Sequence, residues 1–246
     1  MEKKIVSVYG YGRFGKLWAD ILSEDHHVKV FSRRGLTPAD VTPGQQIVDE
    51  KELYNCDALF YCVAISSFED LLIRSKPLFN PDTVYFDTCS VKVFPVKWML
   101  KNLPAKSQII GTHPMFGPDS YPGTNGPLPM VMCDIRTEGK TFAGWVEYFS
   151  GKKMNIQLMT PDQHDKTVAY SQGITHYLGR VLADLNLKTT PISTLGYKKL
   201  LEIIEQTCND SYQLFLDLQK YNPYTEKMRK DLHNSIEKIY SIFLDK

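Results

Sequence analysis

The stretch IVSVYGYGRFG, residues 5–15, decides the fold of this chain. Its first half is a short apolar run rich in β-branched residues, and three glycines then follow in the pattern G-x-G-x-x-G. The residues from Lys16 to Leu22 suit a helix, so the stretch predicts a strand, a tight turn and a helix. In such a unit the first glycine permits the turn, the second lets a diphosphate approach the backbone, and the third lets helix and strand pack closely.

The glycine turn predicts a dinucleotide site. A phosphate would lie at the helix N-terminus, where backbone N–H groups without intrahelical partners and the helix dipole favour an anion. The pattern alone is a weak signal and also fits a plain structural turn, but its place between a strand and a helix favours dinucleotide binding. The residues predicted to contact the cofactor here are Gly10, Tyr11, Gly12, Arg13, Phe14 and Gly15.

The end of the next predicted strand, Val28–Phe31, bears on which dinucleotide is bound. NAD sites carry an acidic residue near this place to bind the ribose 2′-hydroxyl. This chain has Ser32, Arg33 and Arg34 instead, so no carboxylate repels a 2′-phosphate and two guanidinium groups can hold it. The sequence therefore favours NADP over NAD, against the alternative that the two arginines form a solvated strand end.

Strands and helices alternate along the first two thirds of the chain. After a loop around residues 38–44, the predicted strands are 58–63, 83–87, 107–112, 128–133 and 154–159. The predicted helices are 67–78, a stretch after Lys92 through about Leu103, and 141–149. This alternation predicts a mostly parallel, doubly wound α/β sheet of the Rossmann type. Because ligands bind beyond the carboxyl ends of such strands, we expect Val63, Ala64 and Ile65 to face the cofactor.

His113 directly follows one of these strands and precedes a loop rich in proline and glycine. That position lies at the carboxyl edge of the predicted sheet, where nicotinamide chemistry occurs. Imidazole, with an unperturbed pKa of about 6.5, can accept a proton at neutral pH. The residues alone leave two interpretations open, a catalytic base and a turn histidine bonded to backbone.

Composition and charge disfavour several classes of protein. Hydrophobic residues make up 43% and charged residues 23% of the 246 residues, as in ordinary globular proteins, and the net charge is +1. The chain has no basic block, so nucleic acid and anionic membrane are not favoured partners. It also has no apolar run of the roughly 18 residues that a membrane helix needs.

The N-terminus and the cysteines indicate a compartment. Residues 1–4 lead straight into the first predicted strand, so we expect no signal peptide. The five cysteines are scattered and form no C-x-x-C pair. This pattern predicts reduced thiols in a cytoplasmic protein and no metal site.

The character of the chain changes near residue 160. Thr160 suits an N-cap, Pro161 the first helical position and Gln163 the closing residue of a capping box. Beyond this point we predict helices only. We therefore expect a dinucleotide-binding domain over residues 1–160 and a smaller all-α domain over residues 161–246, which serves substrate binding and dimerisation.

The first helix of this second part carries polar residues at helical spacing. His164, Val168, Ser171 and Thr175 are predicted to share one face, with His176 beside it. A polar stripe of this kind is usually a solvated face, so the residues alone do not establish a site.

Two later helices carry apolar stripes. One runs from Leu200 to Leu218 and is predicted to be buried, and the other runs from Met228 to Phe243. Because fewer than a hundred residues of amphipathic helix close a core poorly, we expect packing against a second copy, that is, a homodimer.

Five motifs, in this order, resemble those of the prephenate/arogenate dehydrogenase family of tyrosine biosynthesis. They are GYGRFG at 10–15, DTCSVK at 87–92, GTHPMFGPDS at 111–120, SQGITH at 171–176 and GYKKLL at 196–201. The third is the most specific and the first the least. The resemblance implies an oxidoreductase that oxidatively decarboxylates arogenate, prephenate or both and transfers a hydride to NADP.

The resemblance also implies roles for single residues. His113 would accept the proton of the ring hydroxyl of the substrate, and Ser90 would help to orient that pair. His164, Gln172 and His176 match family positions near the substrate pocket.

Departures from the family pattern bear on the substrate. Many prephenate-type members grip a substrate carboxylate with an arginine where this chain has Lys198 and Lys199, and a lysine lacks the bidentate fork. Many members also have histidine in place of Gln172. Both features resemble the arogenate-preferring, NADP-using branch. Asp119 is a candidate partner for the ammonium group of arogenate, the alternative being a loop carboxylate that caps a turn.

Two other functions stay open from the sequence. One is a β-hydroxyacid-type dehydrogenase, which would use a lysine such as Lys166 in the first helix of the second domain. The His113 loop has no place in that scheme. The other is a non-catalytic NADP-binding sensor.

Overall fold

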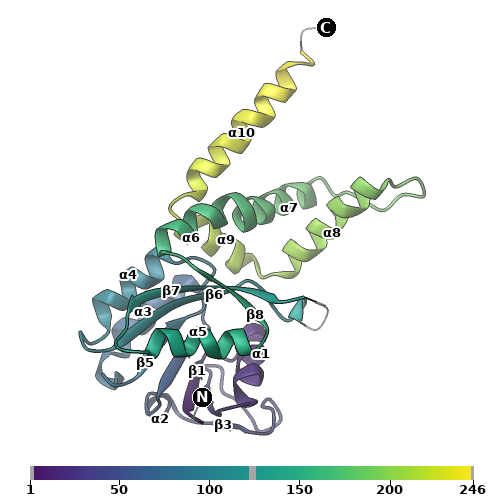
Figure 1. Cartoon of the computed structure of the whole chain (residues 1–246). Coiled ribbons are helices and arrows are strands. Elements are labelled where there is room, and N and C mark those ends of the chain that lie inside the picture. The colour runs from purple at the N-terminus through teal and green to yellow at the C-terminus, as the bar shows by residue number, and fades with distance from the viewer. Residues whose placement is uncertain (1–2, 122–125, 245–246) are drawn as a thin grey trace. The chain divides into compact units, whose positions relative to one another are not determined.

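The computed structural model describes residues 3–121 and 126–244. The chain divides into two compact units, Met1–Pro161 and Asp162–Lys246, which we name the sheet unit and the helical unit. In Figure 1 the sheet unit is coloured from purple to teal and the helical unit from green to yellow.

In the described part of the sheet unit, eight strands form one sheet with the order β3-β2-β1-β4-β5-β6-β7-β8. Their bounds are β1 Ile5–Tyr9, β2 His27–Phe31, β3 Gln45–Ile47, β4 Ala58–Tyr61, β5 Val84–Asp87, β6 Gln108–Pro114, β7 Leu128–Arg136 and β8 Met154–Leu158. Neighbouring strands are parallel except β6 and β7, which are antiparallel. The mostly parallel, doubly wound sheet is confirmed.

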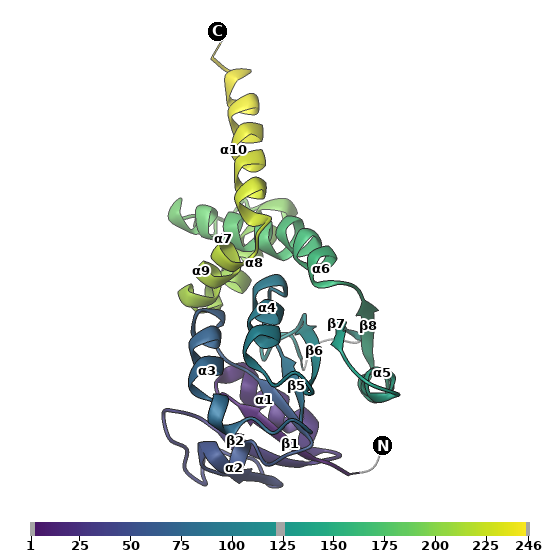
Figure 2. The ribbon, with the colours of Figure 1, turned by 90° about the vertical axis from the view of Figure 1, so that its left-hand side faces the viewer.

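Helices cover both faces of this sheet (Figure 2). They are α1 Arg13–Ser23, α2 Glu50–Leu53, α3 Phe68–Arg74, α4 Val93–Asn102 and α5 Thr141–Gly151. Successive strand side chains point to opposite faces. Phe60 of β4 accordingly packs on Trp18 of α1 and Phe149 of α5, while the next residue, Tyr61, packs on Phe68 of α3.

Two predictions about loops and helices in this unit are wrong in detail. The loop expected after the second strand contains the short edge strand β3 and leads to α2. β3 reads Gln-Gln-Ile, so it lacks the apolar run that marks a strand. The helix expected at 67–78 is α3 flanked by two 3₁₀ turns, Ile65–Ser67 and Lys76–Leu78. Pro77, in the second turn, has no N–H with which to extend α3.

The helical unit is all-α, as predicted. Its elements are α6 Pro161–Val168, a π-helical turn Ala169–Gly173, α7 Ile174–Asp184, α8 Leu195–Asn209, α9 Tyr212–Tyr221 and α10 Thr225–Ser241. The single helix expected from Leu200 to Leu218 is broken, because Asp210 is extended and the side chain of Ser211 caps α9 by accepting from the N–H of Leu214.

The π-helical turn overturns the expected polar face. His164 and Val168 are buried, whereas Ser171, predicted on the same face, is exposed. A π turn adds a residue to the helical repeat and rotates everything after it. The buried side of this segment therefore continues through Gly173 and His176.

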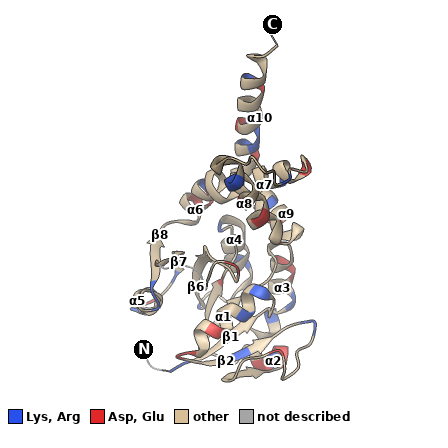
Figure 3. Cartoon of the chain, turned by 90° about the vertical axis from the view of Figure 1, so that its right-hand side faces the viewer, with Lys and Arg blue, Asp and Glu red and all other residues tan. Residues whose placement is uncertain are grey.

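The apolar stripe predicted to be buried in α8 and α9 is only partly buried in the single chain. Thr207 and Leu218 are buried, but Leu200 is 39% exposed. Along α10, burial ends after Met228, and Ile239 is 59% exposed. Charged residues of both signs are interspersed over the described ribbon (Figure 3), and no described helix is long and apolar enough to span a membrane.

Candidate functional site

The three glycines of the turn after β1 have two different roles: Gly10 and Gly15 allow close packing, and Gly12 borders open space. Gly10 has φ +99°, and a Cβ on it would lie 2.3 Å from the carbonyl oxygen of Cys62. A Cβ on Gly15 would lie 1.9 Å from the carbonyl oxygen of Gly10. Around Gly12, in contrast, no heavy atom lies within 4 Å of such a Cβ. The fold therefore requires Gly10 and Gly15, while Gly12 borders open space at the start of α1.

The N-terminus of α1 suits an anion. Its N-cap residue is Gly12, which supplies no side-chain hydrogen bond, and the first described turn holds no acidic residue. The orphan N–H groups and the helix dipole thus face the open space beside Gly12. These features fit the diphosphate of a dinucleotide.

Two residues of the turn brace it against the protein. The hydroxyl of Tyr11 donates to Oε1 of Gln45 on β3 at 2.6 Å, and the ring of Phe14 stacks on Trp18. Both side chains thus support the turn. The predicted contacts of Tyr11 and Phe14 with the cofactor would therefore involve their backbone or the edges of their rings.

The end of β2 lies beside the glycine turn, because the N–H of Gly10 donates to the carbonyl of Phe31 at 2.9 Å. Ser32 starts a turn that closes when the N–H of Gly35 donates to its carbonyl at 3.0 Å. Arg33 and Arg34 stand on this turn and are exposed. Two guanidinium groups are thus presented next to the turn, with no carboxylate between residues 32 and 39.

The end of β4 adjoins the turn from the other side. Cγ1 of Val63 would lie 3.0 Å from a Cβ on Gly10. Ala64 is exposed and begins a 3₁₀ turn, whereas Ile65 is buried. Val63 and Ala64 are therefore available to a ligand, and Ile65 packs inward.

His113 lies on β6 at the same carboxyl edge. The register pairs Asp87, the last residue of β5, with Gly111, so His113 stands two residues beyond the end of β5. From β1 to β6 there are three strand steps, about 14 Å. His113 is 3% exposed and pairs in register with Val131 of β7.

Ser90 follows the end of β5, the strand next to β6. It is 8% exposed, and its Oγ makes no hydrogen bond within the described residues. Buried hydroxyl groups normally have a partner. An orphan hydroxyl at this edge suits an interaction with a bound ligand.

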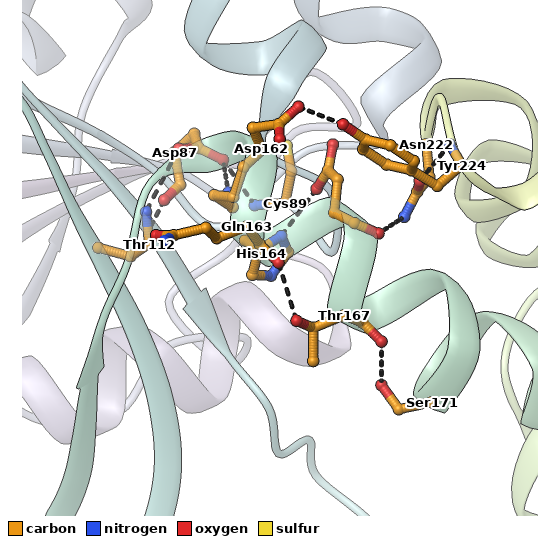
Figure 4. Close-up of polar contacts among 12 residues, drawn as sticks. Asp87, Cys89, Thr112, Asp162, Gln163, His164, Thr167, Ser171, Asn222 and Tyr224 are labelled. Atoms are coloured by element: carbon orange, nitrogen blue, oxygen red, sulfur yellow. Dashed lines mark hydrogen bonds and ion pairs between the residues drawn. The ribbon is translucent and has the colours of Figure 1, made fainter.

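Asp87 and Lys92, which the prediction did not single out, form a buried ion pair beside Ser90. Both side chains are fully buried. Burial raises the pKa of Asp87, and the ammonium of Lys92 opposes this rise. Figure 4 shows that the carboxylate also accepts from the N–H groups of Cys89 and Thr112. The signal in the sequence was the DTCSVK motif itself, at the end of a strand.

Asp119 contacts the glycine turn. Its Oδ1 lies 2.5 Å from Nη2 of Arg13, and the two side chains are 56% and 59% exposed. Turn capping, the alternative role considered for Asp119, is performed by Ser120, whose Oγ accepts from the N–H of Gly117 at 3.0 Å. Two residues predicted for different ligands, Arg13 for cofactor and Asp119 for substrate, are thus adjacent.

In the helical unit, three predicted substrate residues are wholly or partly buried. Nδ1 of His164 lies 2.7 Å from Oδ1 of Asp165, and both side chains are fully buried. Gln172 stands on the π-helical turn, a feature often found at functional sites, and its Oε1 is buried without a hydrogen bond in the described chain. Nε2 of His176 lies 3.8 Å from Oδ2 of Asp210, and burial lowers the pKa of His176.

Around α6, other contacts fix the helix within its unit. The amide of Asn222 donates to the carbonyl of Asp165 at 2.8 Å, and Tyr224 donates to Asp162 (Figure 4). Lys198, the remaining predicted substrate residue, lies in the first turn of α8 and is exposed, as is Lys199.

One cavity in the sheet unit lies away from the candidate site. It measures about 520 Å³ and lies beside the C-terminal end of α1, the end opposite the glycine turn. Lys152, which lines it, already pairs with Glu24 and Asp25.

Comparisons with known proteins decide the family. A model of the prephenate dehydrogenase nucleotide-binding domain matches residues 38–127, and a TYRAAT1-like C-terminal domain matches residues 181–246. Arogenate dehydrogenase 2, chloroplastic, of Arabidopsis thaliana is 31% identical over 245 residues, which cover 95% of this chain and 68% of that protein. The chain belongs to the prephenate/arogenate dehydrogenase family. It is thus a dehydrogenase with a nucleotide-binding domain.

Other relatives agree. Arogenate dehydrogenase 1, chloroplastic, of the same plant is 32% identical, and the match covers 95% of this chain but 38% of that longer protein. The solved arogenate dehydrogenase of Synechocystis has a TM-score of 0.70 at 18% identity over 97% of this chain and 91% of its own. The A. aeolicus prephenate dehydrogenase, solved with hydroxyphenyl propionate and NAD+, has a TM-score of 0.74 at 15% identity, covering 99% and 92%. At these identities the two structures support the fold.

Proposed function

We propose that this dehydrogenase oxidatively decarboxylates arogenate, prephenate or both, with arogenate favoured, and uses NADP as hydride acceptor. The observation that carries the proposal is that the open glycine turn and the pair of Ser90 and His113 occupy one carboxyl edge of the sheet. A dinucleotide lying across this edge, from β1 to β6, would bring its nicotinamide ring toward His113.

In the proposed reaction, His113 and Ser90 at the sheet edge have separate roles. The substrate is a cyclohexadienol with a ring carboxylate and a ring hydroxyl, and bound NADP supplies the acceptor for the hydride. His113 accepts the hydroxyl proton as the hydride leaves the same carbon, and Ser90 orients the hydroxyl. The ring carboxylate then departs as carbon dioxide, its bonding electrons complete the aromatic ring, and the former carbonyl oxygen takes the proton back from His113 to form the phenol.

NADP is favoured by the turn after β2. Arg33 and Arg34 are exposed beside the glycine turn and can pair with a 2′-phosphate, for which guanidinium is well suited. The hydroxyl of Ser32 is a further donor at the same turn.

Arogenate is favoured by Asp119. Its carboxylate contacts Arg13 through an ion pair that is more than half exposed on both sides. Such pairs contribute about 0–1 kcal/mol, so the ammonium group of arogenate can replace the guanidinium at little cost. Asp119→Asn should lower the arogenate/prephenate ratio of kcat/KM. An unchanged ratio in this variant, with Arg13→Gln as the control for loss of the ion pair alone, would remove Asp119 from substrate choice.

The helical unit is proposed to complete the substrate site and to form a homodimer. His164, Gln172, His176 and Lys198 are its proposed substrate residues. The exposed apolar side chains of α10 support the dimer, because a large exposed apolar surface marks an interface. We further propose a cytoplasmic location, which the five free cysteines support and which cell fractionation can test.

One assay tests the activity. NADPH absorbance is followed with arogenate, with prephenate and with a panel of β-hydroxyacids, using NADP and NAD in parallel. Turnover of a cyclohexadienol is expected. Turnover of hydroxyacids alone would indicate the β-hydroxyacid type, and cofactor binding without any turnover would indicate a sensor. Lys166, the lysine that the β-hydroxyacid scheme needs, is exposed on α6 beside the buried His164 and Asp165.

His113→Asn tests the catalytic base. Loss of general base catalysis should lower kcat by about 10²- to 10⁴-fold. The Kd for NADP should change little, because His113 lies three strands from the glycine turn. His27→Asn is the matched control, since His27 is exposed at the amino end of β2. Equal kcat in His113→Asn and wild type would contradict the proposed role.

A further inference from the structure

The carboxylate of Asp87 joins the segment after β5 to strand β6 at the carboxyl edge of the sheet. Its Oδ2 accepts from the N–H of Cys89 at 3.1 Å and from Nζ of Lys92, and its Oδ1 accepts from the N–H of Thr112 at 3.3 Å. The hydroxyl of Thr112 in turn donates to the carbonyl of Asp87 at 2.5 Å. One side chain thus bonds to the backbone of the segment just after β5 and to the backbone of β6 (Figure 4).

These bonds act directly before the two reactive residues. Cys89 precedes Ser90 in the chain, and Thr112 precedes His113. The N–H groups that Asp87 holds lie in the peptides 88–89 and 111–112, each one peptide before the bond that joins Ser90 or His113, so they constrain the backbone that carries those two side chains. Because the bonds come from opposite oxygens of one rigid carboxylate, they also set the position of the segment after β5 relative to β6.

Lys92 balances the charge of this arrangement. Its side chain and that of Asp87 are both fully buried, and Lys92 is the N-cap residue of α4. A buried charge without its partner is strongly unfavourable, so each group requires the other. As a pair they add no net charge beside His113.

We propose that Asp87 and Lys92 are positioning residues for the reaction, which hold Ser90 and His113 in the mutual geometry that proton transfer needs without contacting the substrate. This inference rests on the proposed function. A simple stabilising pair would contribute to folding alone, whereas a positioning pair also sets kcat.

The test separates folding from turnover with Asp87→Asn, Lys92→Met and the double variant. Each single variant leaves one buried charge without its partner and should lower Tm. The double variant leaves neither, so it should regain most of that loss. The side-chain amide introduced by Asp87→Asn, however, has one acceptor oxygen in place of two. It can accept from the N–H of Cys89 or from that of Thr112, but not from both.

The double variant should therefore stay slow. We expect kcat to remain reduced by about 10²-fold, the effect of a misplacement of roughly 1 Å, while KM for NADP changes much less. Lys29→Met is the matched control. Lys29, on β2, is also buried, and it pairs with Glu52 on α2. It should lower Tm and leave kcat near that of wild type.

The possible results are distinct. A double variant with restored Tm and wild-type kcat would overturn the positioning role. If the single variants do not fold, the double variant still decides the matter through kcat. If the wild-type protein turns over no cyclohexadienol, the proposed function itself fails and this inference falls with it.

Discussion

Substitution of single glycines in the turn after β1 should separate folding from cofactor binding. The change is alanine at Gly12 in one variant and at Gly15 in another. Both add one methyl group within the same turn, so each variant is the control for the other. The structure predicts opposite outcomes, because a Cβ at Gly12 meets no atom within 4 Å and a Cβ at Gly15 meets backbone.

Gly15→Ala should lower the stability of the fold. The new Cβ would lie 1.9 Å from the oxygen and 2.9 Å from the carbon of the Gly10 carbonyl. Overpacking costs about 1–3 kcal/mol, and we expect the upper end because backbone cannot move aside as a side chain can. About 3 kcal/mol corresponds to a fall in Tm of roughly 6–12 °C for a chain of this size.

Gly12→Ala should weaken cofactor binding and not the fold. Its φ of −84° and ψ of −166° are open to alanine, so Tm should change by less than about 4 °C. In the proposed site, the methyl group would occupy the space through which the diphosphate approaches the N–H groups of α1. Loss of one hydrogen bond to a charged group, about 1.5–3 kcal/mol, would weaken NADP binding roughly 10- to 150-fold.

The measurements are Tm by calorimetry and Kd for NADP by isothermal titration. Gly12→Ala with wild-type Kd would show that the diphosphate does not pass over this residue. Gly15→Ala with wild-type Tm would show that the contact between α1 and β1 is looser than the structure indicates.

Three further outcomes are expected. Replacement of Arg33 and Arg34 by alanine should raise KM for NADP at least tenfold and leave KM for NAD nearly unchanged; equal effects on both cofactors would rule out 2′-phosphate binding. Burial lowers the pKa of His176 and His26, so the unfolded chain binds more protons and stability is lost as pH falls from about 6.5 through the folded pKa values. His176→Gln should flatten the curve of Tm against pH between 5 and 7, and an unchanged slope would contradict this. Ile239→Glu should convert the proposed homodimer to monomer in sedimentation equilibrium, and a dimer that persists would place the interface elsewhere.

Much of the fold followed from local pattern. The apolar run, the three glycines and the helix-compatible residues after them predicted β1, the turn and α1, because each depends on neighbours in the chain. The alternation of strands and helices then predicted the parallel sheet. The carboxyl-edge placement of His113 followed as well, since the end of a parallel strand has a known side of the sheet.

Other features were outside the reach of local pattern. The edge strand β3 is polar, so its pairing with β2 comes from the fold and not from hydrophobic periodicity. The π-helical turn rotated the face on which Ser171 was expected, and no residue type marks such a turn. The break at Asp210 was missed although Ser211 is a good N-cap residue, because the apolar spacing appeared continuous across it.

The sequence by itself determined most of the strands and helices of the sheet unit and which of their ends carry reactive groups, since hydrophobic period, glycines and caps act over a few residues. Only the tertiary structure decided which of those groups meet. Arg13 contacts Asp119, which lies 106 positions further along the chain, and Asp87 holds Thr112, which lies 25 positions further. Such pairs depend on strand order and register, and these are set by the packing of the whole sheet.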